Sequence, residues 1–195
     1  MPFWDNPAYA AAWQELASGE LATWLQLTPY AYAALEGVHL IGVAVFFGAV
    51  FLLDLRLLGL TPALHAQTTG RFLLRIAAPA FALLAVSGAL LFVPSADRYA
   101  SSPVFFVKLA AMAAGGLNAL AFHVTAWRRI DAWGAGARSP WMARAAAVVS
   151  VLVWVTVIAL GRWMGYERRA PPPADFDDLP FARAVELEPD RTGKT

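Results

Sequence analysis

The chain has 195 residues, of which 59% are hydrophobic and 15% charged, whereas a soluble domain is roughly 45–50% apolar and about 25% charged. Its formal net charge of +1 gives no electrostatic basis for binding nucleic acid. It contains no cysteine, which excludes disulfides, thiolate metal sites and cysteine nucleophiles. The composition therefore predicts an integral membrane protein whose main partner is the lipid bilayer.

The first 28 residues precede the long apolar stretches and contain no lysine or arginine. Within them, AWQELASGELATWLQL (residues 12–27) mixes apolar and polar side chains as a short amphipathic helix at a membrane interface does. Trp24 is of the residue type that lines the boundary between membrane and water. We therefore predict that residues 1–28 form an interfacial segment.

Four charge-free stretches follow along the chain. Each of them, with its flanking residues, supplies the roughly 20 mostly apolar residues that a membrane-spanning helix needs. They are residues 37–53, 76–96, 109–127 and 145–161. Helices of a soluble bundle would show a polar face, and these stretches have none. The sequence therefore predicts an all-α fold, with a four-helix transmembrane bundle over residues 29–166. Residues 167–195, rich in proline and acidic side chains, are expected to form a disordered or loosely docked tail.

The distribution of arginine predicts the orientation in the membrane. Positive side chains concentrate in the first and third connections between spans: Arg56, Arg71, Arg75, Arg128, Arg129, Arg138 and Arg144. Connections rich in positive charge stay on the cytoplasmic side. We therefore expect a multi-pass protein of the cytoplasmic (inner) membrane with both termini outside.

One group of polar side chains is expected in the outer half of the membrane. Glu36 and His39, three residues apart, share a face of the first span. Lys108 and Met112 on the third span and Arg162 on the fourth reach a similar depth, at a rise of about 1.5 Å per residue. An ion pair of Glu36 with Lys108 or Arg162 is one prediction. The alternative is that these charges extend to water at the span ends.

A second group is expected in the inner half. Asp54 on the first span is predicted to pair with Arg75 or Arg144 and so form a buried charge pair. His123 lies close to this level and Asn118 near mid-depth, both on the third span. Because polar groups in hydrocarbon are costly unless paired, Asn118 and His123 are expected to face partner helices.

The third span is also where the smallest side chains gather. Gly115 and Gly116 follow a run of alanines. Small residues let helix backbones approach closely in membranes. The pair therefore predicts either tight helix packing, which we favour, or room for a flat ligand.

Several motifs carry a family resemblance. DLRLLGL (residues 54–60), PVFFVKLA (103–110) and LNALAFH (117–123) resemble an uncharacterised family of small bacterial four-helix integral membrane proteins, marked by DLRLLG and NAL-x-FH. GRWMGY, after the fourth span, is similar to that family's ending. The resemblance implies the fold and residence in a membrane, and it implies no activity. EGVHLIGVAVFFG in the first span loosely resembles CopD-type copper-resistance membrane domains and b-type cytochromes.

A haem site is one hypothesis. Imidazole is a common haem ligand and bundle interiors hold cofactors, so His39 is the candidate axial ligand of a haem b. Lys108 and Arg162 would meet the propionates, and Met112 would supply a second axial ligand unless the iron is five-coordinate. A bis-histidine site is not expected, because parallel first and third spans place His39 and His123 about 16 Å apart in depth.

Three function classes stay open. The first is an accessory or partner-binding subunit of a membrane complex, or a homo-oligomer, with no chemistry of its own. The second is an electron-transfer protein with haem at His39. The third is a transporter or channel for a small solute or a metal. An enzyme is not expected, because the chain carries no metal-binding motif such as HExxH and no phosphate loop.

Overall fold

The computed structural model describes residues 6–132 and 139–167. The chain divides into two units, residues 1–161 and 162–195, and each is described by itself. The described residues form helices and contain no strand. The predicted tail lies outside the described residues from position 168 on, as do Arg138 and the side chain of Arg129.

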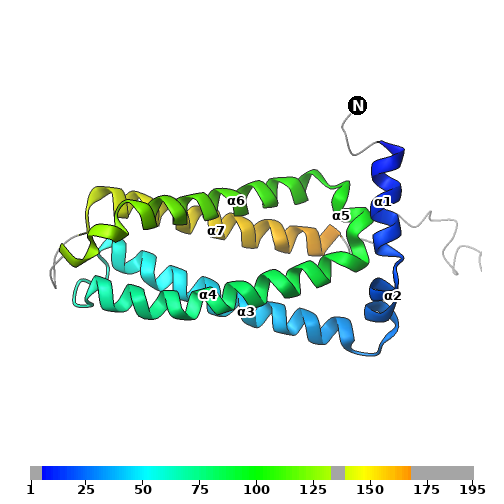
Figure 1. Ribbon diagram of the computed structural model, residues 1–195, viewed down its shortest axis with the longest axis horizontal. Helices are drawn as coiled ribbons and strands as arrows, with labels where there is room; N and C mark the ends of the chain where they lie inside the picture. The colour runs from blue at the N-terminus through cyan, green and yellow to red at the C-terminus, as the bar shows by residue number, and fades with distance from the viewer. Residues whose placement is uncertain (1–5, 133–138, 168–195) are drawn as a thin grey trace, which may run out of the picture. The chain divides into compact units, whose positions relative to one another are not determined.

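Four long helices make up the main body of the first unit (Figure 1). They are α3 (Ala31–Leu58), α4 (Ala66–Phe92), α6 (Pro103–Val124) and α7 (Trp141–Glu167), whose last residues belong to the second unit. The shorter elements are α1 (Pro7–Ala17), α2 (Glu20–Leu27), η2 (Val93–Ser95), α5 (Ala96–Ala100) and η3 (Trp127–Ala132). By length and composition, four helical stretches can cross a membrane, and they are residues 31–58, 66–100, 103–124 and 141–166. The predicted all-α fold with four spans is confirmed.

The end of α3 shows why the first span is longer than its charge-free stretch. Gly59 terminates the helix in the left-handed region (φ 89°), and its N–H donates to the carbonyl of Arg56. A residue without a Cβ adopts this conformation at no steric cost. Because α3 continues to Leu58, both Asp54 and Arg56 lie inside the helix rather than in the following loop.

Helices α3 and α4 pack closely along their length. A Cβ built on Gly42 would lie 3.2 Å from the Leu84 Cβ and 3.3 Å from its backbone nitrogen. Nearer the middle of both helices, the rings of Phe46 and Phe81 are 5.4 Å apart. Pro79 lies inside α4, which continues through it. The small residue on α3 therefore permits backbone contact that a larger side chain would prevent.

Helix α7 packs against both α3 and α6. The Trp154 ring lies 4.8 Å from the ring of Phe46. On the other side, a Cβ on Gly115 would lie 3.1 Å from Val153 Cγ1 and 3.2 Å from Trp154 Cζ2, whereas Gly116 would meet nothing within 4 Å. Gly115 is therefore a point of close helix contact, as the packing interpretation expects, and Gly116 is not.

The N-terminal segment differs from the single helix that its sequence predicts. It forms two helices, α1 and α2, with Ser18 and Gly19 between them. The Tyr9 hydroxyl donates to the carbonyl of Ala100 (3.1 Å), and the Trp13 ring meets the ring of Phe92 edge-on at 5.6 Å. These contacts hold α1 across the direction of the long helices (Figure 1). We call α1 and α2 together the N-terminal arm.

The two ends of the main body are built from different segments. The α3–α4 turn lies at the same end as the last turns of α6 and the start of α7 (Figure 1). The arm and α5 lie at the opposite end. The buried core is concentrated toward the first of these ends, where Leu57, Ala66, Ile130 and Ala143 belong to one cluster.

Candidate functional site

His39 and Ser87 join α3 to α4 in the half of the bundle nearer the arm. The distance from His39 Nδ1 to Ser87 Oγ is 3.0 Å, and the Ser87 hydroxyl donates to the Leu83 carbonyl at 2.7 Å. A hydroxyl carries one hydrogen, so with that hydrogen directed at Leu83 it is the imidazole Nδ1–H that donates to Ser87. This tautomer leaves a lone pair on His39 Nε2. A backbone hydrogen bond with Leu84 of α4 also acts on the imidazole.

Gly88 provides the space in which the imidazole lies. A Cβ at this position would be 3.0 Å from His39 Cε1 and 3.6 Å from Nδ1. A contact of 3.0 Å is tighter than nine in ten contacts that real Cβ atoms make. Ser87 and Gly88 together therefore fix the ring, one by a hydrogen bond and the other by the absence of a side chain.

Two charged side chains of the predicted outer group lie near His39. Lys108 and Glu36 are both close enough to act electrostatically on the imidazole. The Lys108 ammonium also reaches α7, where its Nζ would lie 3.4 Å from a Cβ on Gly161. Within the part of the chain that the structure describes, Glu36 and Lys108 do not form the predicted ion pair. The structure thus brings Glu36, His39 and Lys108 to one region without a direct charge contact.

Met112 and Arg162 are the other residues of the haem hypothesis. Met112 is partly buried on α6, one turn beyond Lys108. Arg162 begins the second unit, and there its Nη2 donates to the Tyr166 hydroxyl (3.4 Å) while its guanidinium lies 5.1 Å from the Tyr166 ring centre. Within its own unit Arg162 therefore contacts an aromatic residue one turn along α7.

The inner group is arranged differently from the prediction. Asp54 is buried, and the Ser150 side chain on α7 lies within interacting range of its carboxyl group. Arg75 and Arg144 are exposed, and neither forms an ion pair with Asp54 among the described residues. The predicted buried charge pair is therefore not formed, because both arginines lie on faces of α4 and α7 that point away from the core.

Asn118 and His123 were both expected to face partner helices, and the structure shows different hydrogen bonds for the two residues. The Asn118 amide nitrogen donates to the Ala146 carbonyl of α7 at 2.9 Å. His123 Nδ1 donates to the Ala119 carbonyl of its own helix at 2.8 Å, and its ring lies 5.6 Å from the Trp127 ring. Asn118 thus links two helices, whereas the Nδ1 hydrogen bond of His123 stays within α6.

Sequence reasoning missed two residues of this arrangement. Ser87 is 3% exposed and Arg56 is 1% exposed. A polar side chain alone in a charge-free stretch was the available signal for Ser87. The near-complete burial of the Arg56 side chain could not be predicted from the sequence, where Arg56 contributes positive charge to the first connection. Among the described residues, no group of three or more His, Cys, Asp or Glu side chains could hold a metal ion.

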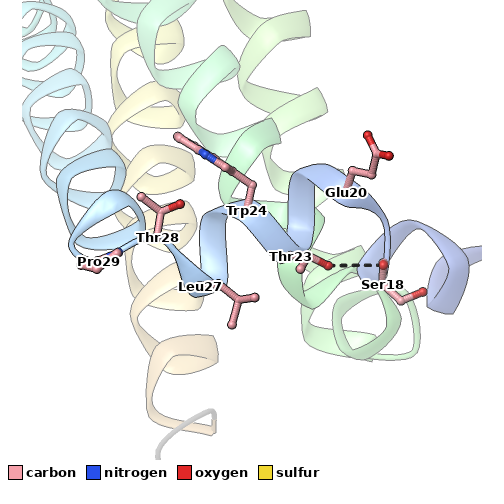
Figure 2. A pocket seen from close by; sticks show the side chains of 7 residues that line it. All are labelled: Ser18, Glu20, Thr23, Trp24, Leu27, Thr28 and Pro29. Carbon is pink, nitrogen blue, oxygen red and sulfur yellow. Dashed lines mark hydrogen bonds between the residues drawn. The ribbon is translucent and has the colours of Figure 1, made fainter.

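A shallow hollow on the N-terminal arm is separate from these residues. Figure 2 shows its lining, which consists of Ser18, Glu20, Thr23, Trp24, Leu27, Thr28 and Pro29. The Thr23 hydroxyl donates to the Ser18 carbonyl at 3.5 Å. Trp24 is 57% exposed and Leu27 76%. Exposed aromatic and apolar side chains beside hydroxyls are typical of the membrane boundary. The lining contains no histidine, so none of the candidate haem ligands lies in this hollow.

The fold and the buried polar links define a small all-helical protein with four helices able to cross a membrane. The model of a family of unknown function, DUF6644, matches residues 28–167, and the chain belongs to this family. The match agrees with the resemblance to an uncharacterised family, while the looser likeness to CopD-type domains stays a prediction. No curated protein and no solved structure matches the chain.

Proposed function

We propose that the protein binds a haem b through His39 and serves in electron transfer in the bacterial cytoplasmic membrane. The observation that carries the proposal is the hydrogen bond from His39 Nδ1–H to Ser87. A ligating histidine almost always donates its other ring N–H to a fixed acceptor, which sets the tautomer and the ring orientation. In His39 this acceptor is Ser87, and the tautomer that donates from Nδ1 leaves a lone pair on Nε2.

The surroundings support an anionic, planar ligand on one side of His39. The contact between Gly42 and Leu84, one turn along α3, leaves no room for a flat ligand between α3 and α4. The haem of this proposal therefore approaches from α6, where the Lys108 ammonium is close enough to act on the imidazole. Lys108 would pair with a propionate, and Met112 would supply the sixth ligand unless the iron is five-coordinate.

Absorption spectra of the purified protein test this proposal. Wild-type protein from haem-replete cells is expected to show a Soret band that His39→Ala abolishes and His123→Ala retains. Ser87→Ala should weaken haem retention by about tenfold, the lower end for loss of a group that orients a ligand. A colourless wild-type protein contradicts the proposal. Equal loss in both histidine variants contradicts the assignment to His39.

An accessory or partner-binding subunit is the second candidate, and a separate observation favours it. The polar links at depth, His39 with Ser87 and Asn118 with Ala146, join helices of the same bundle and need no ligand to account for them. Interhelical hydrogen bonds of this kind are ordinary in membrane proteins. In this role the protein would bind another membrane subunit or a second copy of itself.

Cross-linking in native membranes followed by mass spectrometry separates the two candidates. A stable partner band together with a colourless protein supports the accessory role. A Soret band that depends on His39, in a protein without a partner, supports haem binding. A colourless protein without any partner contradicts both.

A further inference from the structure

Arg56 is a buried cation whose hydrogen-bonding groups are only partly used. Its side chain is 1% exposed, and its Nε–H donates to the carbonyl of Leu64 in the α3–α4 loop. Among the described residues, neither Nη1 nor Nη2 has a hydrogen-bond partner, although both nitrogens are buried. A buried charge without a partner is strongly unfavourable, which calls for an anion.

The nearest acidic side chain on the same helix does not supply this anion. Asp54 is two residues away, and side chains two apart on a helix do not face each other. Its carboxyl group has Ser150 of α7 within interacting range instead. Among the described residues, Arg56 forms no ion pair.

Three further buried polar atoms without partners occur at the same end of the bundle. They are Thr61 Oγ1, His65 Nδ1 and Ser139 Oγ. Thr61 and His65 flank the loop segment whose carbonyl Arg56 binds, and Ser139 lies two residues before α7. Leu57, Ala66 and Ala143, which neighbour these residues in sequence, belong to one core cluster. Apart from these atoms and those of Arg56, the described residues contain no other buried side-chain nitrogen or oxygen without a partner.

We propose that Arg56 is the anchor of a binding site for a phosphate group at this end of the bundle. A guanidinium offers two parallel N–H donors that match the oxygens of a phosphate. The hydroxyls of Thr61 and Ser139 and the imidazole of His65 are all able to donate, and no acidic side chain is among them. An oxyanion is therefore the class of ligand that the unpartnered Nη1 and Nη2 donors of Arg56 would satisfy.

The depth of Arg56 indicates where such a ligand would come from. Arg56 lies 11 to 12 residues from the middle of α3, or about 17 Å along the helix. The hydrocarbon half-thickness of a bilayer is about 15 Å, so Arg56 is at the level of the lipid head groups. Both a phospholipid head group and free phosphate present the required group there. Because Nη1 and Nη2 are covered, binding requires the exposed residues 62–64 of the loop to move outward.

Thermal unfolding and native mass spectrometry of the full-length protein in detergent test the site. The probes are phosphatidylglycerol, inorganic phosphate and, as a control for ionic strength, chloride. The variants are Arg56→Gln and Arg56→Lys, with Arg71→Gln as the matched control, since Arg71 is an exposed arginine of α4 near the same end.

Saturable stabilisation of the wild type by one probe, with one bound molecule per chain, is expected. Arg56→Gln should abolish it, Arg56→Lys should weaken the affinity by about tenfold because lysine lacks the forked donors, and Arg71→Gln should leave it unchanged. Stabilisation by the lipid alone identifies a head-group site, and stabilisation by phosphate alone identifies a site for a free anion. If the wild type binds neither probe, or if Arg56→Gln binds as tightly as the wild type, the proposal is overturned. Should Arg56→Gln fail to fold, the wild-type titrations and Arg56→Lys still decide the question.

Discussion

His39 on α3 and Ser87 on α4 meet at 3.0 Å, from imidazole Nδ1 to hydroxyl oxygen, inside a bundle whose outer surface is apolar. Ser87 in turn donates to the Leu83 carbonyl of its own helix. The three groups form a chain of two hydrogen bonds that ties the orientation of one side chain on α3 to the backbone of α4. This relationship is compatible with both proposed functions, since it orients the imidazole of the candidate haem ligand and also joins two helices.

Ser87→Ala is expected to lower the free energy of unfolding by about 0.6 to 1.7 kcal/mol, the range measured for interhelical hydrogen bonds in membranes. The loss arises because Ser87 then no longer accepts the hydrogen bond from the half-buried imidazole of His39. Denaturant titration in detergent, followed by helical circular dichroism, measures it. Thr156→Ala is the control, because the Thr156 hydroxyl is exposed and binds only the Leu152 carbonyl of its own helix. Equal effects of the two substitutions would show that the His39 link contributes nothing.

Gly88→Val tests the space that holds the imidazole. A Cβ there would come within 3.0 Å of His39 Cε1, so the ring must move and its hydrogen bond to Ser87 must lengthen. Overpacking of this kind costs about 1–3 kcal/mol. Gly48→Val on α3 is the matched control, since a Cβ at Gly48 meets nothing within 4 Å. The same titration measures both variants, and a Gly88 variant as stable as the Gly48 variant would mean that the ring has another position open to it.

Two substitutions of Asn118 can be compared by which of them destabilises the protein more. Asn118→Leu removes the donor that binds the Ala146 carbonyl and leaves an apolar contact in its place. Asn118→Asp keeps the shape but directs an oxygen at that carbonyl, so the repulsion adds to the lost hydrogen bond. We expect the aspartate variant to be less stable than the leucine variant by at least about 1 kcal/mol, as judged by unfolding in detergent. The reverse order would indicate that Asn118 faces water rather than α7.

The sequence predicted the helices well because lipid leaves few alternatives. A backbone in hydrocarbon must satisfy its own hydrogen bonds, so long apolar stretches become helices whatever their neighbours are. Counting residues along each helix predicts the depth of a side chain, and Glu36 and Lys108 both act electrostatically on His39. The rotation of each helix about its own axis could not be obtained by counting residues. The direction in which each side chain leaves its helix depends on how neighbouring helices pack.

The failed pairing of Asp54 shows this limit most clearly. Asp54, Arg75 and Arg144 are at suitable depths, yet the two arginines are exposed and Ser150 faces the carboxyl group instead. Ser87 escaped notice for the same reason, because nothing in the sequence of α4 indicates that its polar face meets His39. The burial of Arg56 could not be predicted for a similar reason, because the sequence does not show how the chain packs around the last turns of α3.

The predicted orientation can be tested because the chain has no cysteine, so that one introduced thiol is a unique label. Glu20 on the N-terminal arm and Ala63 in the α3–α4 loop are both exposed, and the arm and the loop lie at opposite ends of the main body (Figure 1). If the arginine-rich connections face the cytoplasm, a membrane-impermeant maleimide added to spheroplasts should label Glu20→Cys and not Ala63→Cys. After permeabilisation, both variants should be labelled to the same extent, which controls for local reactivity. Labelling of Ala63→Cys alone in intact spheroplasts would show that the orientation is the reverse of the predicted one. It would then place the proposed phosphate site in the outer leaflet and His39 nearer the cytoplasm.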